Sequence, residues 1–180
     1  MTQVETLREQ PFFLSLSGSQ IAKLSPLASK VSFRQDEIIL ETGKPSESFY
    51  VLLSGCVRIE VSTKSFNYCI QDVGPGEVFG WSSLLGQHDT LFQVRARDES
   101  TALCLDGARL REVLHSDPEL EAELLRRSLA VAADRIRATE IKLGQLFGLP
   151  MSSKVKSAVA KCDGNCTPAC ADNHFGVGTH

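Results

Sequence analysis

The sequence has no uninterrupted apolar run that approaches the roughly 18 residues of a membrane-spanning helix. Its first ten residues also lack the apolar core of a secretory signal peptide. Basic residues are not in excess, because 19 Lys and Arg stand against 22 Asp and Glu, for a net charge of −3. A general nucleic-acid binder needs a basic face. We therefore predict a cytoplasmic protein without a membrane segment and without direct DNA binding.

Recognisable catalytic patterns are equally scarce. No Ser-His-Asp, paired-carboxylate or Walker-type arrangement stands out. Histidine occurs four times, at His88, His115, His174 and His180, without a metal-ligand spacing inside the part expected to fold. We predict that the chain is not an enzyme.

The middle of the chain reads as a series of short strands. Alternating or short apolar segments separated by turn residues occur at 31–34, 37–40, 49–53, 57–61, 68–73, 92–96 and 102–105. No long helix interrupts them. The pattern predicts a mainly β fold with flanking helices, built on a jelly-roll barrel. We expect an N-terminal helical segment at 1–30, the barrel at 31–106, helices at 107–147 and a tail at 148–180.

One loop in the barrel region combines turn and helix-start signals. Gly74-Pro75-Gly76 forces a turn, and Gly80 permits a positive φ or a close approach. Ser82 or Ser83 is expected to cap a short helix through Leu84 and Leu85. A loop that enters a helix N-terminus directs free N–H groups at one point, which favours an anion. The alternative is an ordinary hairpin turn followed by one capped helical turn.

A long helix follows the barrel region. Asp106 is expected to cap a short helix, and Ser116 or Asp117 a second one that has Pro118 in its first turn and runs to about Gln145. Apolar and small residues repeat with a spacing of 4-3-4-3-4-3 at Leu125, Leu129, Ala132, Ile136, Thr139, Leu143 and Leu146. This seam could pack on the barrel of its own chain, but its 3.5-residue period favours a partner helix. We predict a homodimer through residues 117–147.

The order of these elements resembles the cyclic-nucleotide-binding domain of the catabolite activator and FNR regulator family. The resemblance covers about residues 5–147. It is carried by Phe13-Leu14-Ser15, Ile21-Ala22-Lys23-Leu24, Gly43-Lys44-Pro45, the segment 49–57 (FYVLLSGCV), the segment 74–80 (GPGEVFG) and Val94-Arg95-Ala96. In that family the loop is a phosphate-binding cassette, which here spans 74–91. The DNA-reading helix-turn-helix that follows in the transcription factors has no counterpart in the tail.

The cassette departs from the family pattern at its two main side chains. Trp81 stands where the family has a Glu for the ribose hydroxyl, and Thr90 stands near Asp89 where it has an Arg for the cyclic phosphate. The bidentate guanidinium contact to phosphate is therefore missing. The resemblance implies a ligand site at Gly80, Trp81, Ser82, Ser83, Thr90, Leu91, Arg95 and Thr139. Its ligand would be a cyclic nucleotide or another small molecule, with classical cyclic AMP binding not favoured.

Three cysteines and a histidine cluster near the end of the chain. Cys162, Cys166, Cys170 and His174 could complete a tetrahedral zinc site, or the thiolates could hold an iron–sulfur cluster. The three-residue gaps match no strong zinc signature. The alternatives are a reduced cytosolic tail without metal, or intermolecular disulfides.

These observations predict a regulatory, ligand-sensing module with a degenerate cassette that signals through its long helix to an unknown partner protein. Two alternatives stay open. One is a metal or redox sensor that uses the C-terminal cysteines, and the other is a bare dimerisation or scaffold domain.

Overall fold

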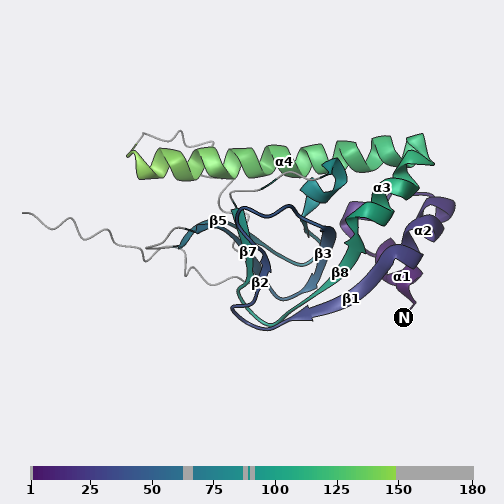
Figure 1. The fold of residues 1–180 in the computed structure, drawn as a ribbon, viewed down its shortest axis with the longest axis horizontal. Coiled ribbons are helices and arrows are strands. Elements are labelled where there is room, and N and C mark those ends of the chain that lie inside the picture. The colour runs from purple at the N-terminus through teal and green to yellow at the C-terminus, as the bar shows by residue number, and fades with distance from the viewer. Residues whose placement is uncertain (1, 63–66, 87–88, 90–91, 149–180) are drawn as a thin grey trace, which may run out of the picture.

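Two four-stranded antiparallel sheets face each other and form the barrel (Figure 1). The computed structural model describes residues 2–62, 67–86, 89 and 92–148. The strands are β1 (Ala28–Phe33), β2 (Ile38–Leu40), β3 (Ser48–Ser54), β4 (Val57–Ser62), β5 (Asn67–Val73), β6 (Val78–Phe79), β7 (Phe92–Ala96) and β8 (Ser100–Asp106). The strand order is β1-β8-β3-β6 in one sheet and β2-β7-β4-β5 in the other. The predicted mainly β jelly roll is confirmed.

Alternation along the strands decides which side chains fill the barrel. On β4, Val57 and Ile59 are fully buried and point inward, whereas Arg58 between them faces outward to Asp72. In this way the inner core takes side chains from both sheets: Leu52, Val57, Ile59, Val73, Phe79, Val94 and Ala102. Tyr50 stacks on Phe79 inside the barrel, with ring centroids 4.7 Å apart. Burial raises the pKa of Tyr50 to about 12.

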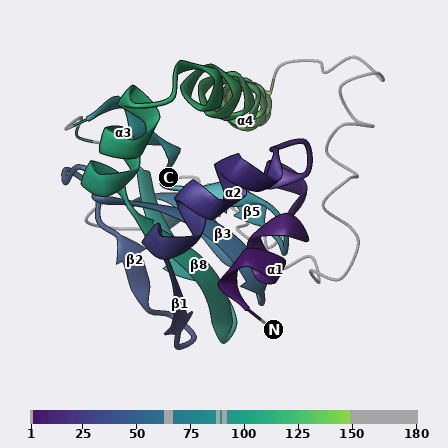
Figure 2. The same ribbon diagram turned by 90° about the vertical axis from the view of Figure 1, so that its right-hand side faces the viewer.

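A second core lies between the outer face of β3 and β8 and the helices. It is approached from the N-terminal side by α1 (Gln3–Arg8), the 3₁₀ turn η1 (Pro11–Phe13), α2 (Gly18–Leu24) and η2 (Ser25–Leu27). Capping boxes at Thr2 and Ser17 begin α1 and α2. Phe13, Phe49 and Leu105 are among the fully buried members of this core. Figure 2 shows α1 and α2 against the β8 side of the barrel.

The chain leaves the barrel through α3 (Gly107–His115) and α4 (Pro118–Leu146). Asp106 caps α3 by accepting from the Arg109 N–H, and Asp117 caps α4 by accepting from the Leu120 N–H. Both predicted helices are therefore confirmed, and α4 ends one residue beyond the predicted Gln145. The 29-residue α4 lies along the barrel (Figure 1). Among the described residues, no helix has the length and apolar content that crossing a membrane requires.

Candidate ligand-binding site

The glycine-rich loop is held tightly on β3 by backbone hydrogen bonds. The Gly76 N–H donates to the Leu52 carbonyl at 2.8 Å, and the Leu52 N–H donates to the Glu77 carbonyl at 2.9 Å. The Glu77 carboxylate accepts from the Gly74 N–H at 2.6 Å and closes the turn. Gly76 adopts φ = 84°, which favours glycine. The predicted turn at Gly74-Pro75-Gly76 is thereby confirmed.

Gly80 both takes a left-handed conformation and lies against neighbouring backbone. Its φ is 71°, and a Cβ at this position would lie 2.4 Å from the Ser48 carbonyl oxygen. Gly80 begins the 3₁₀ helix η3 (Trp81–Leu85), which has no side-chain cap. The prediction that Ser82 or Ser83 caps this helix is wrong. The left-handed Gly80 makes the turn itself, so the serine hydroxyls are not needed at the helix start.

Three side chains of η3, those of Trp81, Ser83 and Leu84, pack toward the protein core, whereas Leu85 is exposed. Trp81 is partly buried against the core that the helices cover, and Leu84 is a buried member of it. Ser83 is fully buried, with its Cβ facing the backbone at Gly107, and its carbonyl accepts from the Arg111 guanidinium. η3 therefore packs against both the barrel and α3.

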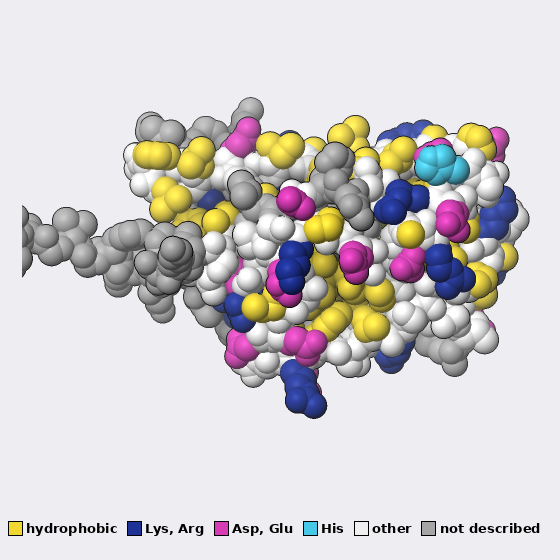
Figure 3. All heavy atoms as spheres, in the orientation of Figure 1, with side chains coloured by type: hydrophobic (Ala, Val, Ile, Leu, Met, Phe, Trp, Pro, Cys, Tyr) yellow, Lys and Arg dark blue, Asp and Glu magenta, His cyan; other side chains and the backbone are white. Residues whose placement is uncertain are grey.

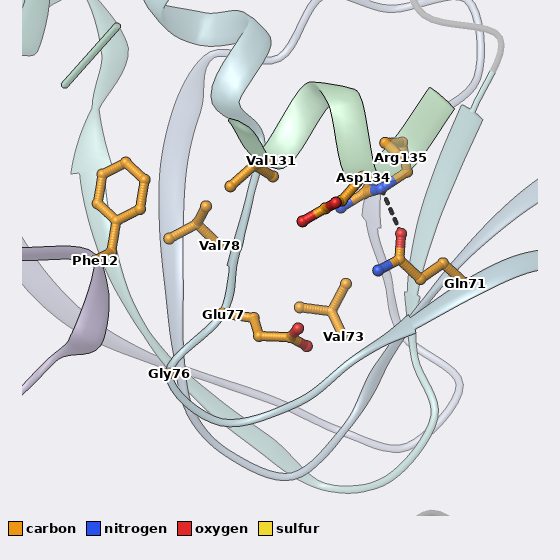
Figure 4. A pocket seen from close by; sticks show the side chains of 9 residues that line it. All are labelled: Phe12, Gln71, Val73, Gly76, Glu77, Val78, Val131, Asp134 and Arg135. Atoms are coloured by element: carbon orange, nitrogen blue, oxygen red, sulfur yellow. Dashed lines mark hydrogen bonds between the residues drawn. The ribbon is translucent and has the colours of Figure 1, made fainter. Parts of the chain in front are cut away.

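A cavity of about 200 Å³ lies beside this loop, between the β5–β6 turn and α4. Figure 4 shows the side chains around it. Its walls comprise Phe12, Gln71, Val73, Gly76, Glu77, Val78, Val131, Asp134 and Arg135. The apolar members come from η1, β5, β6 and α4. Of the polar ones, Gln71 lies on β5, Glu77 in the β5–β6 turn, and Asp134 and Arg135 on α4. The cavity is thus formed by elements far apart in the sequence.

Arg135 is the cation of this cavity. Its Nε donates to Gln71 Oε1 at 2.9 Å, a neutral acceptor on β5 (Figure 4). Burial lowers the pKa of the Arg135 guanidinium to about 10, an effect that the nearby Glu77 carboxylate opposes. The guanidinium remains charged at neutral pH, but its environment does not favour that charge.

Comparison with known proteins gives this architecture a family. Residues 30–117 match the family model described as the cyclic nucleotide-binding domain. The barrel belongs to the cyclic nucleotide-binding domain family. The predicted resemblance is confirmed at this level.

Transcriptional regulators are among the relatives that this cyclic nucleotide-binding domain matches. The chain is 26% identical over 152 residues to a CRP-like cAMP-activated global transcriptional regulator of Mycobacterium tuberculosis, covering 84% of this chain and 66% of the relative. The N-terminal domain of a transcriptional regulator from Streptomyces coelicolor is 28% identical, with a TM-score of 0.58 over 74% of this chain and 93% of that one. A Geobacter metallireducens protein assigned to the cyclic nucleotide-binding proteins is 27% identical, with a TM-score of 0.67 over 76% and 99%. The chain spans 27 to 66% of the length of the curated relatives it matches.

The predicted ligand residues of the cyclic nucleotide-binding domain do not gather around the cavity. Gly80, Trp81, Ser82 and Ser83 form the loop beside it, and none of them lines it. Thr139 lies on α4, where its hydroxyl donates to the Arg135 carbonyl at 2.8 Å. Thr90 and Leu91 lie outside the described residues. The assignment of all these residues to a ligand site stays a prediction.

Arg95 lies on the outer face of the β2-β7-β4-β5 sheet. Its neighbour Val94 points into the inner core, so alternation directs Arg95 away from it. Its Nε is 2.8 Å from Glu60 Oε1, and its Nη1 donates to the Asp36 carbonyl at 2.9 Å. The geometry therefore engages Arg95 with Glu60 and does not bring it to the loop.

The cysteines divide into two groups. Cys56 is buried, as expected for a small core residue, whereas Cys69 and Cys104 are only partly buried. The predicted metal ligands Cys162, Cys166, Cys170 and His174 lie outside the described residues. Over the part of the chain that the structure describes, no group of three or more His, Cys, Asp or Glu side chains is placed to hold a metal.

The sequence analysis missed the polar side chains that line the cavity. Gln71 and Val73 are two residues apart and lie on the same face of β5. Val131 and Arg135 are four residues apart on one face of α4. That helix spacing is visible in the sequence. It could have identified a second face of α4 beside the seam, but not the strand that the face covers.

Proposed function

We propose that this chain is a regulatory module in which the cyclic nucleotide-binding domain responds to a small ligand and signals through a homodimer of α4. The observation that carries the proposal is that one helix, α4, both lines the cavity and carries an exposed apolar seam. α4 provides Val131, Asp134 and Arg135 to the cavity, and the same helix displays an exposed apolar seam. A ligand that shifts α4 would therefore shift the surface that a partner contacts.

The seam supports a second copy of this chain as the partner. Leu129, Ile136 and Leu143 are seven residues apart and are 70%, 61% and 52% exposed. Leu146 and Phe147 extend the exposed apolar surface at the end of the helix. Hydrophobic side chains are visible along α4 in Figure 3. Exposed Leu and Ile at heptad spacing are typical of a helix that pairs with another helix.

The heptad register favours a parallel pair. With Leu129, Ile136 and Leu143 at the a positions, a β-branched residue stands at the middle a position. Ile at a favours a two-stranded parallel arrangement.

The ligand is a small molecule whose binding does not depend on the Glu and Arg side chains of the family's cassette. Trp81 packs into the core and cannot accept a hydrogen bond from a ribose hydroxyl. Arg95 is paired with Glu60. Backbone amides of the loop and the side chains of the cavity remain as the groups that a ligand could contact. A cAMP-activated relative makes cyclic nucleotides the first compounds to test.

Thermal unfolding with cyclic AMP, cyclic GMP and cyclic dinucleotides tests the proposal. A ligand at a hundred times its dissociation constant stabilises the fold by about 2.7 kcal/mol, which is readily seen as a higher melting temperature. The helix variant Arg135→Met should remove the stabilisation, and Arg126→Met, which changes an exposed guanidinium nine residues away on the same helix, should retain it. A stabilisation that is the same in both variants would contradict a ligand site beneath α4.

A further inference from the structure

We infer that the cavity beneath α4 selects an uncharged guanine-type heterocycle over a phosphorylated ligand. The inference rests on the proposed function, because it names the ligand class of the same site. It follows from the charges, the apolar walls and the hydrogen-bonding groups of the cavity.

The charges of the cavity do not favour an anion. Arg135 contributes one positive charge and Glu77 one negative charge. Asp134 is an exposed side chain at the rim, and its carboxylate lies 3.8 Å from the Arg137 guanidinium. In Figure 4 the Glu77 side chain points toward the side of the cavity where Arg135 and Gln71 lie. A phosphate placed there would therefore meet a cation whose charge a carboxylate already offsets. A neutral ligand does not need a net positive charge.

The walls of the cavity suit a flat apolar body. Phe12, Val73, Val78 and Val131 supply apolar side chains from four different elements. The volume of about 200 Å³ is small for a binding site of drug-sized ligands, which occupy about 300–1,000 Å³. A compact ring system fits such a space, with any sugar directed to the open side.

The polar groups complement the edges of guanine. An Arg guanidinium donates two hydrogen bonds to the O6 and N7 acceptors of a guanine. Carboxylates accept from its N1–H and N2–H donors. Arg135 has a single neutral acceptor, Gln71, among the described residues, so its remaining N–H groups can serve a ligand. Glu77 uses Oε2 for the Gly74 N–H, and its second oxygen is open to accept.

The test is calorimetric titration of the full chain with guanosine, cyclic GMP and adenosine. We expect guanosine to bind at least tenfold more tightly than cyclic GMP and than adenosine. Glu77→Gln retains an acceptor for the Gly74 N–H but loses the charge, and it should weaken guanosine binding about tenfold. Glu112→Gln, an exposed carboxylate on α3, is the matched control and should change nothing.

Asp134→Asn separates charge selection from simple contact. It removes the carboxylate at the rim of the cavity and leaves the Arg137 guanidinium without that partner, so the preference for guanosine over cyclic GMP should fall. An unchanged preference would overturn the inference. Tighter binding of cyclic GMP than of guanosine would overturn it while the proposed ligand sensing stands. Binding of none of the nucleosides and nucleotides would overturn both.

Discussion

Arg135 on α4 and Gln71 on β5 are joined by a hydrogen bond of 2.9 Å between Nε and Oε1. This bond connects the long helix to the strand that borders the cavity. It places a guanidinium in a largely buried position opposite a neutral acceptor. A buried charge without a directly paired carboxylate is usually unfavourable for stability, and it is often found where a protein binds something.

Replacing Arg135 with Met should stabilise the ligand-free protein by about 1–3 kcal/mol. Burial lowers the guanidinium pKa to about 10, so the folded state disfavours a charge that the unfolded state carries freely at neutral pH. Methionine fills a similar space without that charge. Chemical denaturation measures the effect. Arg137→Met, at an exposed position two residues away, should change stability by less than about 0.5 kcal/mol, and equal effects of the two variants would contradict this reading.

Ile136→Asp should convert a dimer into a monomer. The substitution puts a carboxylate in the middle of the exposed apolar seam, where the proposed partner helix packs. Ala130→Asp puts the same side chain at an exposed position of α4 outside the seam and should leave the dimer intact. Analytical ultracentrifugation of the two variants and the unmodified protein decides the matter. A monomeric unmodified protein, or a dimer that survives Ile136→Asp, would be evidence against the seam.

Gly80→Ala should destabilise the protein by about 2–4 kcal/mol. The new Cβ would lie 2.4 Å from the Ser48 carbonyl oxygen and would also have to tolerate φ = 71°. Gly43→Ala is a matched control, since Gly43 has φ = 76° but no atom within 4 Å of the new Cβ. Conformational strain alone should make Gly43→Ala cost about 1 kcal/mol. Denaturant unfolding curves with equal midpoints for the two variants would show that the close approach at Gly80 has no effect.

Asp117→Asn should lower stability at neutral pH and have little effect in acid. The pKa of Asp117 lies below its ordinary value of 3.8, first because Lys23 hydrogen-bonds the carboxylate and then because the Leu120 N–H does. A carboxyl whose pKa is lower in the folded state stabilises that state above the ordinary pKa, and the effect is lost as the pH falls through the folded pKa. Melting temperatures of both proteins between neutral and acidic pH give the comparison. A gap that stays constant over this range would exclude the ion pair with Lys23 as its cause.

Local patterns in the sequence were sufficient for most of the fold. The alternation at 57–61 predicted a strand, and Asp106 and the pair Ser116 and Asp117 marked two helix starts. The structure confirms both starts and places the second cap at Asp117. The serine cap in the loop was wrong because Gly80 adopts a left-handed conformation that starts η3 without a side chain. A serine cap and a left-handed glycine give similar signals in the sequence. Only the packing of Gly80 against the Ser48 carbonyl distinguishes the two kinds of helix start.

The cavity could not be predicted in the same way. Its chemistry depends on β5 meeting α4, two elements whose contacting residues Gln71 and Arg135 are 64 positions apart. Family resemblance directed attention to the loop at Gly80–Ser83, in which Trp81 packs against the core and Ser83 packs beside Gly107 of α3. Periodicity places Arg135 on a helix face next to the seam but cannot say what lies beneath it.

The length of α4 also has a mechanical consequence. At about 1.5 Å per residue, Arg135 lies about 16 Å and Leu146 about 33 Å along the axis from Leu124, which is buried in the core. If α4 pivots as a rigid rod at Leu124, a rotation of about 5° moves Arg135 by roughly 1.4 Å and Leu146 by roughly 2.9 Å. The helix then acts as a lever with its pivot in the core, and a displacement produced at the cavity is about doubled at the last turn of α4.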